Sequence, residues 1–327
     1  MDRARSLTSD ASAEAQRAII GAVRAFAAQY APADRVCVAL SGGADSLALT
    51  AAAVRAGLEV HAVVVDHRLQ DGSGGVADRA AATARSLGAT AEVRAVTVTG
   101  AGGTEAAARR ARYAALDEAR SARPVLLGHT LDDQAETVLL GLGRGSGARS
   151  LAGMRPWSRP WGRPLLGIRR AQTRAACAGW ELPVWDDPHN DDPRFTRVRV
   201  RSEVLPLLDD VLGGGVAEAL ARTATQLQDD LDALDAPAEE LLAECAYGRT
   251  LDLEPLDDAP AALRTRVLRA WLLSIGAAEP SYRVVSAVDA LVTDWHGQGP
   301  IAVGGDQRAR LVVTRRAREL HIKREAR

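Results

Sequence analysis

Lysine is almost absent from this sequence. Lys323 is the single lysine among 41 basic residues, so nearly every positive charge is carried by arginine. A Walker A loop, G-x-x-x-x-G-K-[ST], needs a lysine directly after its glycine-rich turn to reach the phosphates of a nucleotide. Lys323 lies close to the C-terminus and follows no such turn. The lack of lysine therefore excludes a nucleotide site of the Walker A type.

Cysteine and long apolar runs are also scarce. The three cysteines, Cys37, Cys177 and Cys245, are far apart and form no C-x-x-C pair. Isolated cysteines argue against a structural zinc site and favour a reducing compartment. No apolar run approaches the length that spans a bilayer, and the first ten residues, MDRARSLTSD, lack the apolar core of a secretory signal. We therefore expect a cytoplasmic protein with no membrane partner.

The charges are unevenly spread along a chain whose net charge is only −1. Residues 144–201 carry 12 arginines against 5 acids, and residues 259–327 carry 12 basic residues against 6 acids. Between them, residues 202–258 carry 2 arginines against 15 acids. Two basic segments indicate where a polyanion would bind, although ordinary solvated surface charge is the alternative.

The first distinctive pattern is RVCVALSGGADS, residues 35–46. Its apolar start predicts a buried strand, and Gly42 and Gly43 allow a sharp turn that can approach a ligand closely. Asp45 and Ser46 then open an Ala/Leu-rich helix that stops at Gly57. A strand, a glycine turn and a helix N-terminus in this order form an anion site, whereas an ordinary turn between strand and helix is the plainer interpretation.

The remaining pattern alternates strands and helices. With 327 residues, the chain has room for about two domains. Four alternations predict an α/β fold with a doubly wound, mostly parallel, Rossmann-like sheet, whose ligands bind beyond the carboxyl ends of the strands. Residues 1–212 would form this domain, Gly213–Gly215 the boundary, and residues 216–327 a smaller α+β domain. Helices are expected at 10–30, 47–57, 76–88, 104–120, 131–143, 170–178, 216–245, 261–275 and 282–292, and strands at 36–40, 59–65, 91–98, 124–129, 251–258, 301–304, 310–314 and 319–323.

Polar residues gather at the predicted strand ends. Ser41, Asp66, Thr104/Glu105 and His129 should all face the same edge of the sheet. His129 begins the segment HTLDDQAETVLL, in which Asp132 and Glu136 are four residues apart on one helix face. Two carboxylates placed in this way can hold Mg²⁺ or an ammonium group. Acids that merely suit the positive end of the helix are the alternative.

Two glycine patterns do not fit a dinucleotide site. The glycines of SGGADS are adjacent and lack the third glycine of G-x-G-x-x-G. GLGRGSGA, residues 141–148, half-matches that motif, but it follows a predicted helix instead of a strand.

SGGADS resembles the S-G-G-x-D-S PP-loop of the N-type ATP pyrophosphatases. Together with H-x-x-D-D-Q-x-E-T at 129–137, it resembles the tRNA(Ile)-lysidine synthetase family. The likeness runs over residues 35 to 210, about half of the chain. Further matches occur in order at VDHRL (65–69), GTEAAARRARYAAL (103–116), RGSGARSLAGM (144–154), RPLLGIRR (163–170) and DPHN (187–190). One departure is Arg197-Val198-Arg199-Val200-Arg201, where the family usually has R-N-x-x-R. Longer members also carry a further C-terminal domain, for which this chain is too short.

The resemblance implies a ligase that joins L-lysine to C2 of the wobble cytidine in CAU-anticodon tRNA(Ile). An adenylated cytidine is the intermediate, ATP is split to AMP and pyrophosphate, and codon specificity changes from AUG to AUA. ATP and Mg²⁺ are the implied cofactors, and lysine and tRNA the partners. ATP-binding residues would be Ser41, Gly42, Gly43, Ala44, Asp45, Ser46, Asp66, His67 and His129, with Asp45 and Asp132 near the metal. Arg109, Asp133 and Glu136 would bind lysine and act with Asp45 in catalysis, and Arg144, Arg149, Arg194, Arg197, Arg199 and Arg201 would face the tRNA.

Two other functions are weighed against this one. A PP-loop tRNA thiolase would need a sulfur relay, usually with paired cysteines, and the sequence has none. A non-catalytic adenine-nucleotide sensor would need neither the Asp133/Glu136 pair nor the arginine-rich segment 144–201. The sequence leaves the oligomeric state open, with a homodimer among the options.

Overall fold

The computed structural model describes residues 2–68, 72–99, 103–145, 147–277, 279–305 and 309–326. The chain divides into two compact units. The first unit contains Met1–Leu140 and Gly153–Thr223, and the second contains Gly141–Ala152 and Ala224–Arg327. The interdomain boundary expected at Gly213–Gly215 stays a prediction.

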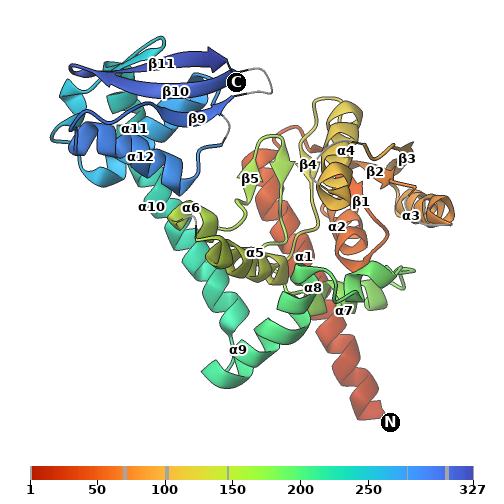
Figure 1. Cartoon of the computed structure of the whole chain (residues 1–327). Helices are drawn as coiled ribbons and strands as arrows, with labels where there is room; N and C mark the ends of the chain where they lie inside the picture. The colour runs from red at the N-terminus through yellow and green to blue at the C-terminus, as the bar shows by residue number, and fades with distance from the viewer. Residues whose placement is uncertain are drawn as a thin grey trace. The chain divides into compact units, whose positions relative to one another are not determined.

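The first unit contains a six-stranded sheet in the order β3-β2-β1-β4-β6-β5 (Figure 1). Every neighbouring pair is parallel except β5 and β6, which pair antiparallel. The predicted doubly wound, mostly parallel sheet is therefore confirmed. Its strands are β1 (Arg35–Leu40), β2 (Glu59–Asp66), β3 (Thr90–Ala95), β4 (Val125–Leu126), β5 (Trp157–Ser158) and β6 (Trp161–Gly162).

Helices cover both faces of this sheet because its central strands are apolar on both sides. On one face, Val36, Val38 and Leu40 of β1 pack in a core with helices α1, α2, α3 and α7. On the other face, Cys37 and Ala39 pack with α4. These helices and the remaining ones of the first unit's sequence are α1 (Asp2–Tyr30), α2 (Ala44–Arg55), α3 (Ser73–Ser86), α4 (Thr104–Ala119), α5 (Leu131–Arg144), α7 (Arg170–Gly179), α8 (Thr196–Arg199) and α9 (Leu205–Leu212).

The structure corrects several element lengths. The strands expected at 91–98 and 124–129 are shorter, and α1 begins at Asp2 instead of residue 10. The short hairpin β5–β6 was not predicted, because two-residue strands leave no alternating pattern to detect. The fourth strand ends at Leu126, where the chain enters the loop that carries Gly128 and His129.

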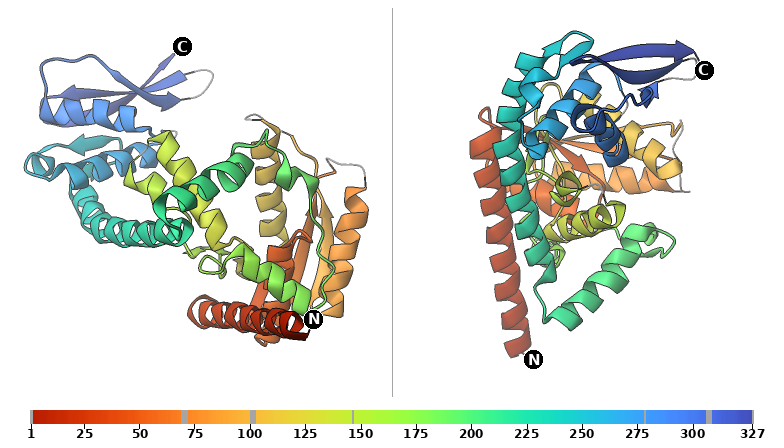
Figure 2. Two further views of the ribbon diagram at one scale, coloured as in Figure 1. Left: turned by 90° about the horizontal axis from the view of Figure 1, so that it is seen from below. Right: turned by 60° about the vertical axis from the view of Figure 1, so that its left-hand side comes forward.

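The second unit contains an antiparallel sheet in the order β7-β8-β11-β10-β9. Figure 2 shows its last strands, near the C-terminus, in blue. The core of this unit surrounds Trp271, which is fully buried with Leu251, Val313 and Leu320. The expected α+β character of this part is confirmed. The elements are α6 (Ala148–Leu151), α10 (Val216–Cys245), α11 (Ala261–Ser274), α12 (Tyr282–Thr293), β7 (Ala246–Tyr247), β8 (Thr250–Asp252), β9 (Ile301–Gly305), β10 (Ala309–Arg316) and β11 (Glu319–Ala326). Only the latter part of α10 belongs to this unit.

Among the residues described, none of the helices combines the length and the apolar character needed to cross a membrane.

Leu49 tests how far the core of the first unit determines its stability. Its side chain is 0% exposed in α2, whereas Leu207 in α9 is 60% exposed. Leu49→Ala removes buried apolar contacts and leaves a cavity, so the free energy of unfolding should fall by about 2–5 kcal/mol. Leu207→Ala should change it by less than about 0.5 kcal/mol. Urea unfolding followed by circular dichroism measures both, and equal midpoints for the two variants would contradict the assigned core.

Candidate active site

The glycine turn after β1 has the geometry that its sequence predicts. Gly42 has a φ of +87°, a left-handed conformation that favours glycine, and an added Cβ would lie 3.3 Å from the Cβ of Ala80. Gly43 is extended and caps α2. The first N–H groups of α2 have no acceptor within the helix, so they are available to an anion at the turn.

Ser46 holds this turn in shape. Its Oγ accepts a hydrogen bond from the backbone N–H of Ser41 at 3.1 Å and donates one to the Gly43 carbonyl at 3.0 Å. The hydroxyls of Ser41 and Ser46 are also 3.1 Å apart. Ser46 is buried, so its hydroxyl organises the loop from within, while the exposed Ser41 lies at the surface of the turn.

The loop after β4 lies directly against this turn. A Cβ on Gly128 would lie 3.1 Å from backbone atoms of both Asp45 and Ser46, closer than nearly all real Cβ contacts, so a side chain here would force the two loops apart by a few tenths of an ångström. β1 and β4 are neighbours, and the connections from β1 lead to β2 on one side while β4 lies on the other. This reversal of strand order is the position where open α/β sheets bind their ligands. His129 and Asp45 are thereby brought to one edge.

Arg170 contacts four of the acids that the sequence singled out. Its guanidinium lies 2.8 Å from Asp133, 3.4 Å from Asp45 and 3.5 Å from Glu136. Its backbone N–H donates to Asp132 at 2.7 Å. Asp45 also accepts a hydrogen bond from the Thr173 hydroxyl, one turn further along α7. The start of α7 therefore neutralises and orders the acidic side of the site.

Glu136 is fully buried, with 0% of its side chain exposed. Arg201 binds it through two nitrogens, at 2.7 and 3.2 Å, and Arg197 lies 3.4 Å from its second oxygen. Two of the arginines expected to face tRNA are thus paired with an acid expected to bind lysine.

The titration of the acids follows from burial and from Arg170. Burial opposes ionisation of Asp133, but Arg170 and hydrogen bonds from Thr130 outweigh it and hold the pKa of Asp133 below its usual value. Burial dominates at Asp45 and raises its pKa, although Thr173 and Arg170 favour the ionised form. Asp133 is therefore the more firmly charged of the two.

His129 is a neutral imidazole at physiological pH. Burial, opposed by Asp133 and reinforced by Arg163 and nearby arginines, lowers the pKa of His129 to about 3. Its Nδ1 is buried and has no hydrogen-bond partner among the described residues. The pKa of His67 is also lowered, first by burial and then by Arg112. His67 Nδ1 likewise lacks a partner in the described part of the chain, so both rings have a nitrogen available to a ligand.

A group of arginines, Arg109, Arg112 and Arg163, lies close enough to His129 to affect its titration. Arg109 stacks on the Tyr113 ring at 4.9 Å and donates to its hydroxyl at 3.1 Å. Burial and the neighbouring Arg109 lower the pKa of Arg112, and burial also lowers that of Arg163. Arg112 has no ion pair or hydrogen bond among the described residues. Arginines packed together without an acid suit an anionic ligand.

Other predicted residues lie as follows. Asp66 is buried and accepts the backbone N–H of Arg68 at 2.9 Å, which fixes the end of β2. Nothing is described for the side chains of Thr104 and Glu105, so the convergence expected of them lies outside the described residues. Arg144 is exposed, Arg149 pairs with Asp235, Arg194 with Asp192 and Arg199 with Glu203. The assignment of these arginines to tRNA stays a prediction.

One acid of the site, Asp45, is placed to hold Mg²⁺. Mg²⁺ in phosphate-transfer sites is held by one or two carboxylates, with phosphates and waters supplying the rest. Asp45 lies beside the loop and can serve in this way. Asp132 is engaged by Arg169 at 3.3 Å and by the Arg170 N–H. Within the described ranges, no three His, Cys, Asp or Glu side chains form a metal-binding group.

Sequence reasoning missed four residues of this site: Arg112, Arg163, Arg170 and Thr173. Three of them lie inside the segments that carry the family resemblance, Arg112 in 103–116 and Arg163 and Arg170 in 163–170. The spacing of Arg109 and Arg112, which places both on one helix face, was a usable signal. Nothing local indicates that Arg170 reaches Asp45, because 125 residues separate them.

Arg170→Gln tests how much the Arg170 guanidinium stabilises the buried acids. Without the guanidinium, Asp133 and Glu136 lose a counter-ion, so the free energy of unfolding at pH 7.5 should fall by about 3–5 kcal/mol. In the native protein the lowered pKa of Asp133 gives stability that is present above its unfolded pKa and lost as pH falls through the lower folded value. In the variant Asp133 becomes easier to protonate, so the deficit should shrink between pH 7.5 and pH 4.5.

The matched control is Arg174→Gln, on the same helix, because its pair with Asp186 is exposed. That variant should lose less than about 1 kcal/mol at either pH. Urea unfolding at both pH values tests the pair of variants, and a pH-independent deficit in Arg170→Gln would contradict the electrostatic role of Arg170.

Comparisons with known proteins agree with this geometry. The PP-loop domain family matches residues 15–208, and the TilS substrate binding domain family matches residues 251–321. The tRNA(Ile)-lysidine synthase of Nocardia farcinica is 60% identical over 310 residues, which are 94% of this chain and 98% of that protein. The protein of the same name from Mycobacterium tuberculosis is 55% identical over 321 residues, covering 95% and 99%.

A solved structure shows the same fold at low sequence identity. The U34-tRNA thiolase NcsA from Methanococcus maripaludis aligns with a TM-score of 0.50 and 17% identity, covering 65% of this chain and 80% of that one. That likeness concerns the fold alone. The family matches and the close relatives, which span nearly the whole chain, establish that the chain belongs to the tRNA(Ile)-lysidine synthase family.

Proposed function

We propose that this chain joins L-lysine to C2 of the wobble cytidine in a CAU-anticodon tRNA(Ile), with ATP as the energy source. In the first step, the cytosine O2 attacks the α-phosphate of ATP, and the bond to the β-phosphate breaks to release pyrophosphate. In the second step, the lysine ε-amine attacks C2, and the C2–O bond breaks to release AMP. The observation that supports this most strongly is the contact of Arg170 with both Asp45 of the loop and the Asp133/Glu136 pair.

The first step needs stabilisation of a leaving pyrophosphate. The N–H groups at the start of α2 and the Ser41 hydroxyl lie where the loop can donate hydrogen bonds to it. Asp45 would hold Mg²⁺, which when bound supplies positive charge to the phosphates. Neutral His67 and His129 each offer a ring nitrogen to the nucleotide without adding charge.

The second step needs acids to bind the lysine ammonium and accept its proton. Asp133 is ionised and hydrogen-bonded in place, so it is suited to binding a cation. Glu136 lies one turn from Asp133 on α5, so it can accept the proton that the ε-ammonium must lose for its nitrogen to attack. Arg109 and Arg112 can bind the lysine α-carboxylate or a phosphate, since neither has an acidic partner among the described residues.

Lysine can reach Glu136 only after a guanidinium moves, because the carboxylate is fully buried. Of its three arginine partners, Arg197 has the most exposed side chain, at 43%, against 21% for Arg170 and 29% for Arg201. We infer that Arg197 moves first. A tRNA phosphate near Arg197 would compete for its guanidinium, which would couple the opening of the lysine site to tRNA binding.

The cysteines disfavour the thiolase alternative. Burial raises the pKa of Cys37 and Cys177 to about 12 and that of Cys245 to about 11. Such thiols remain protonated at physiological pH and are poor nucleophiles. A nucleotide sensor, the other alternative, would not need the arrangement of acids around Arg170. ATP–pyrophosphate exchange with and without tRNA separates a sensor from a ligase.

The direct test is mass analysis of nucleosides from CAU-anticodon tRNA(Ile) incubated with the protein, ATP and lysine. Lysidine should appear only when all three substrates are present. A sulfur-containing cytidine, or unmodified tRNA under every condition, would contradict the proposed function.

Asp45→Asn tests the first step. The substitution keeps the shape of the side chain but removes its charge, so pyrophosphate release should fall by about 10²-fold or more. tRNA binding should be nearly unchanged, because Asp45 lies beside the loop that holds pyrophosphate. Asp78→Asn, an exposed position on α3, is the control and should behave like the native protein. Near-normal pyrophosphate release by Asp45→Asn would show that the loop assignment is wrong.

Glu136→Gln tests the second step. Loss of a charge-assisted contact should raise the lysine concentration required by about 10²-fold, while pyrophosphate release continues and the adenylated tRNA accumulates. Pyrophosphate release and labelled lysine incorporation are followed in one reaction, with Glu118→Gln, an exposed position on α4, as the control. Parallel loss of both activities in Glu136→Gln would place this carboxylate at the ATP site instead of the lysine site.

A further inference from the structure

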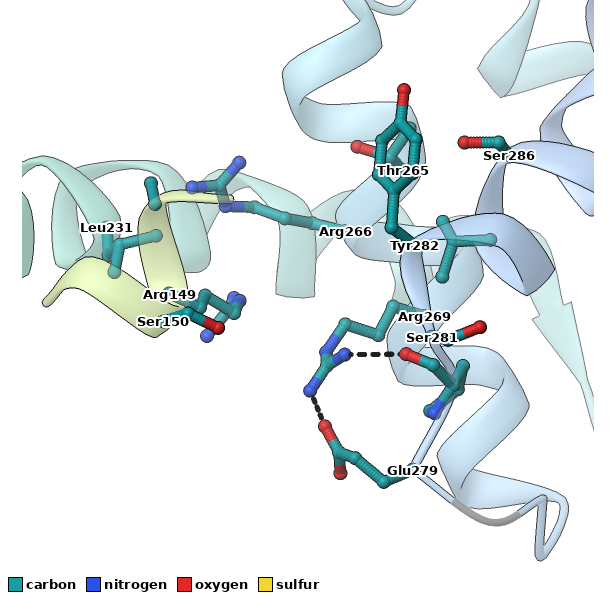
Figure 3. Close-up of a pocket in the computed structure, with 13 residues that line it drawn as sticks. Arg149, Ser150, Leu231, Thr265, Arg266, Arg269, Glu279, Ser281, Tyr282 and Ser286 are labelled. Atoms are coloured by element: carbon teal, nitrogen blue, oxygen red, sulfur yellow. Dashed lines mark hydrogen bonds and ion pairs between the residues drawn. The ribbon is translucent and has the colours of Figure 1, made fainter. Parts of the chain in front are cut away.

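A cavity of about 410 Å³ lies within the second unit (Figure 3). Residues 148–150, α10, α11 and the start of α12 form its walls. Three arginines line it, together with one acid and several hydroxyl groups. Those used below are Arg149, Arg266, Arg269, Glu279, Ser281 and Ser286.

Among the described residues, the arginines that line the cavity outnumber by one the acids that pair with them. Arg149 and Arg266 share a single acid, since both bind the same oxygen of Asp235, at 2.6 and 3.0 Å. Arg269 pairs with Glu279. Three guanidiniums therefore face two carboxylates. Burial and the nearby Arg149 lower the pKa of Arg269 and outweigh Asp235, which acts in the opposite direction.

The acid on Arg269 is weakly held. The Glu279 side chain is 70% exposed, and such surface ion pairs contribute little free energy. The Arg269 guanidinium also donates to the Pro280 carbonyl at 3.2 Å, which fixes it at the cavity when Glu279 leaves (Figure 3). An anion with a better match to the guanidinium can displace Glu279 and find Arg269 already in place.

Neutral donors complete the wall at the start of α12. Ser281 caps the helix by accepting the Val284 N–H at 3.4 Å, so its own hydroxyl hydrogen remains free to donate. The Ser286 hydroxyl has no hydrogen bond among the described residues. Guanidiniums and hydroxyl donors are among the groups that bind the phosphate oxygens of nucleic-acid backbones.

We propose that this cavity binds a phosphodiester group of the tRNA backbone, held by Arg269 and the start of α12. A phosphodiester carries one negative charge, which matches the excess of one positive charge in the cavity. The identity of the RNA as tRNA rests on the proposed function, whereas the phosphate chemistry rests on the residues of the cavity. Arg149, which the sequence predicted to face tRNA, contributes to this wall.

Two substitutions should move tRNA affinity in opposite directions. Arg269→Gln removes the guanidinium, so binding should weaken on the order of 10-fold and the salt dependence should fall by about one phosphate contact. Glu279→Gln removes the competing acid, so binding should strengthen about 2- to 5-fold, the strength of an exposed ion pair. Binding is measured by fluorescence anisotropy of labelled tRNA(Ile), without ATP or lysine, at several salt concentrations.

Matched controls are Arg249→Gln and Glu244→Gln, because both residues are exposed in the second unit and neither lines the cavity. Each should leave affinity and salt slope unchanged. Unchanged binding in both Arg269→Gln and Glu279→Gln would overturn the proposal. Weaker binding in Glu279→Gln would also overturn it, since the acid would then be structural and not a competitor.

Inorganic phosphate separates an RNA site from a site for a small phosphate ligand. At matched ionic strength, phosphate should inhibit tRNA binding more than chloride does, and Arg269→Gln should abolish the difference. Phosphate binding that depends on Arg269 but does not affect tRNA affinity would overturn the RNA assignment. Because tRNA binding is measured without the reaction, a failure to detect lysidine in the separate nucleoside assay would contradict the proposed function alone.

Discussion

The acidic half of the site depends on the Arg170 guanidinium. The carboxylates of Asp45, Asp133 and Glu136 all lie within 3.5 Å of this guanidinium. Without it, three negative charges so close together would repel strongly in a half-buried environment. Arg170 makes this arrangement stable by offering several donors in a rigid planar group, a geometry that lysine cannot supply. A chain that uses arginine for nearly every positive charge therefore has the side chain that this constraint requires. Arg170 also links Asp45 of the loop to Asp133 and Glu136 of α5, so a change of charge at the loop alters the electrostatic environment of the α5 acids.

The strand order of the sheet determines why these groups meet at all. β1 and β4 are neighbours, although more than 80 residues of chain lie between Leu40 and Val125. The loops that follow these two strands therefore begin side by side, at Ser41 and near Gly128. Because Gly128 has no Cβ, the loop after β4 packs closely against the backbone of Asp45. A close contact of this kind is rigid, because it is made by main chain against main chain. Catalytic groups placed on rigid elements keep the separations that the chemistry needs.

The sequence was sufficient for elements whose cause is local. The strand, glycine turn and helix around Ser41, the alternation of strands and helices, and the helix Val216–Cys245 follow from periodicity and turn residues. Contacts such as Arg201 with Glu136 could not be predicted, since 65 residues separate them and the fold alone brings them together. For the same reason, the net charge of residues 144–201 indicates a basic segment but does not tell which guanidiniums turn inward onto acids.

The site separates its charges, and this separation suits the proposed substrates. Asp45, Asp133 and Glu136 provide negative charge on one side, while Arg109, Arg112 and Arg163 provide positive charge around His129. Free lysine carries an ammonium at one end and a carboxylate near the other, so it can satisfy both sides at once. His129 lies near both groups as a neutral ring, because burial keeps its pKa at about 3. A charged imidazole there would weaken the attraction of the acids for the lysine ammonium. Its neutrality therefore keeps the negative and positive sides of the site distinct, and binding of free lysine by both of its charged ends depends on that separation.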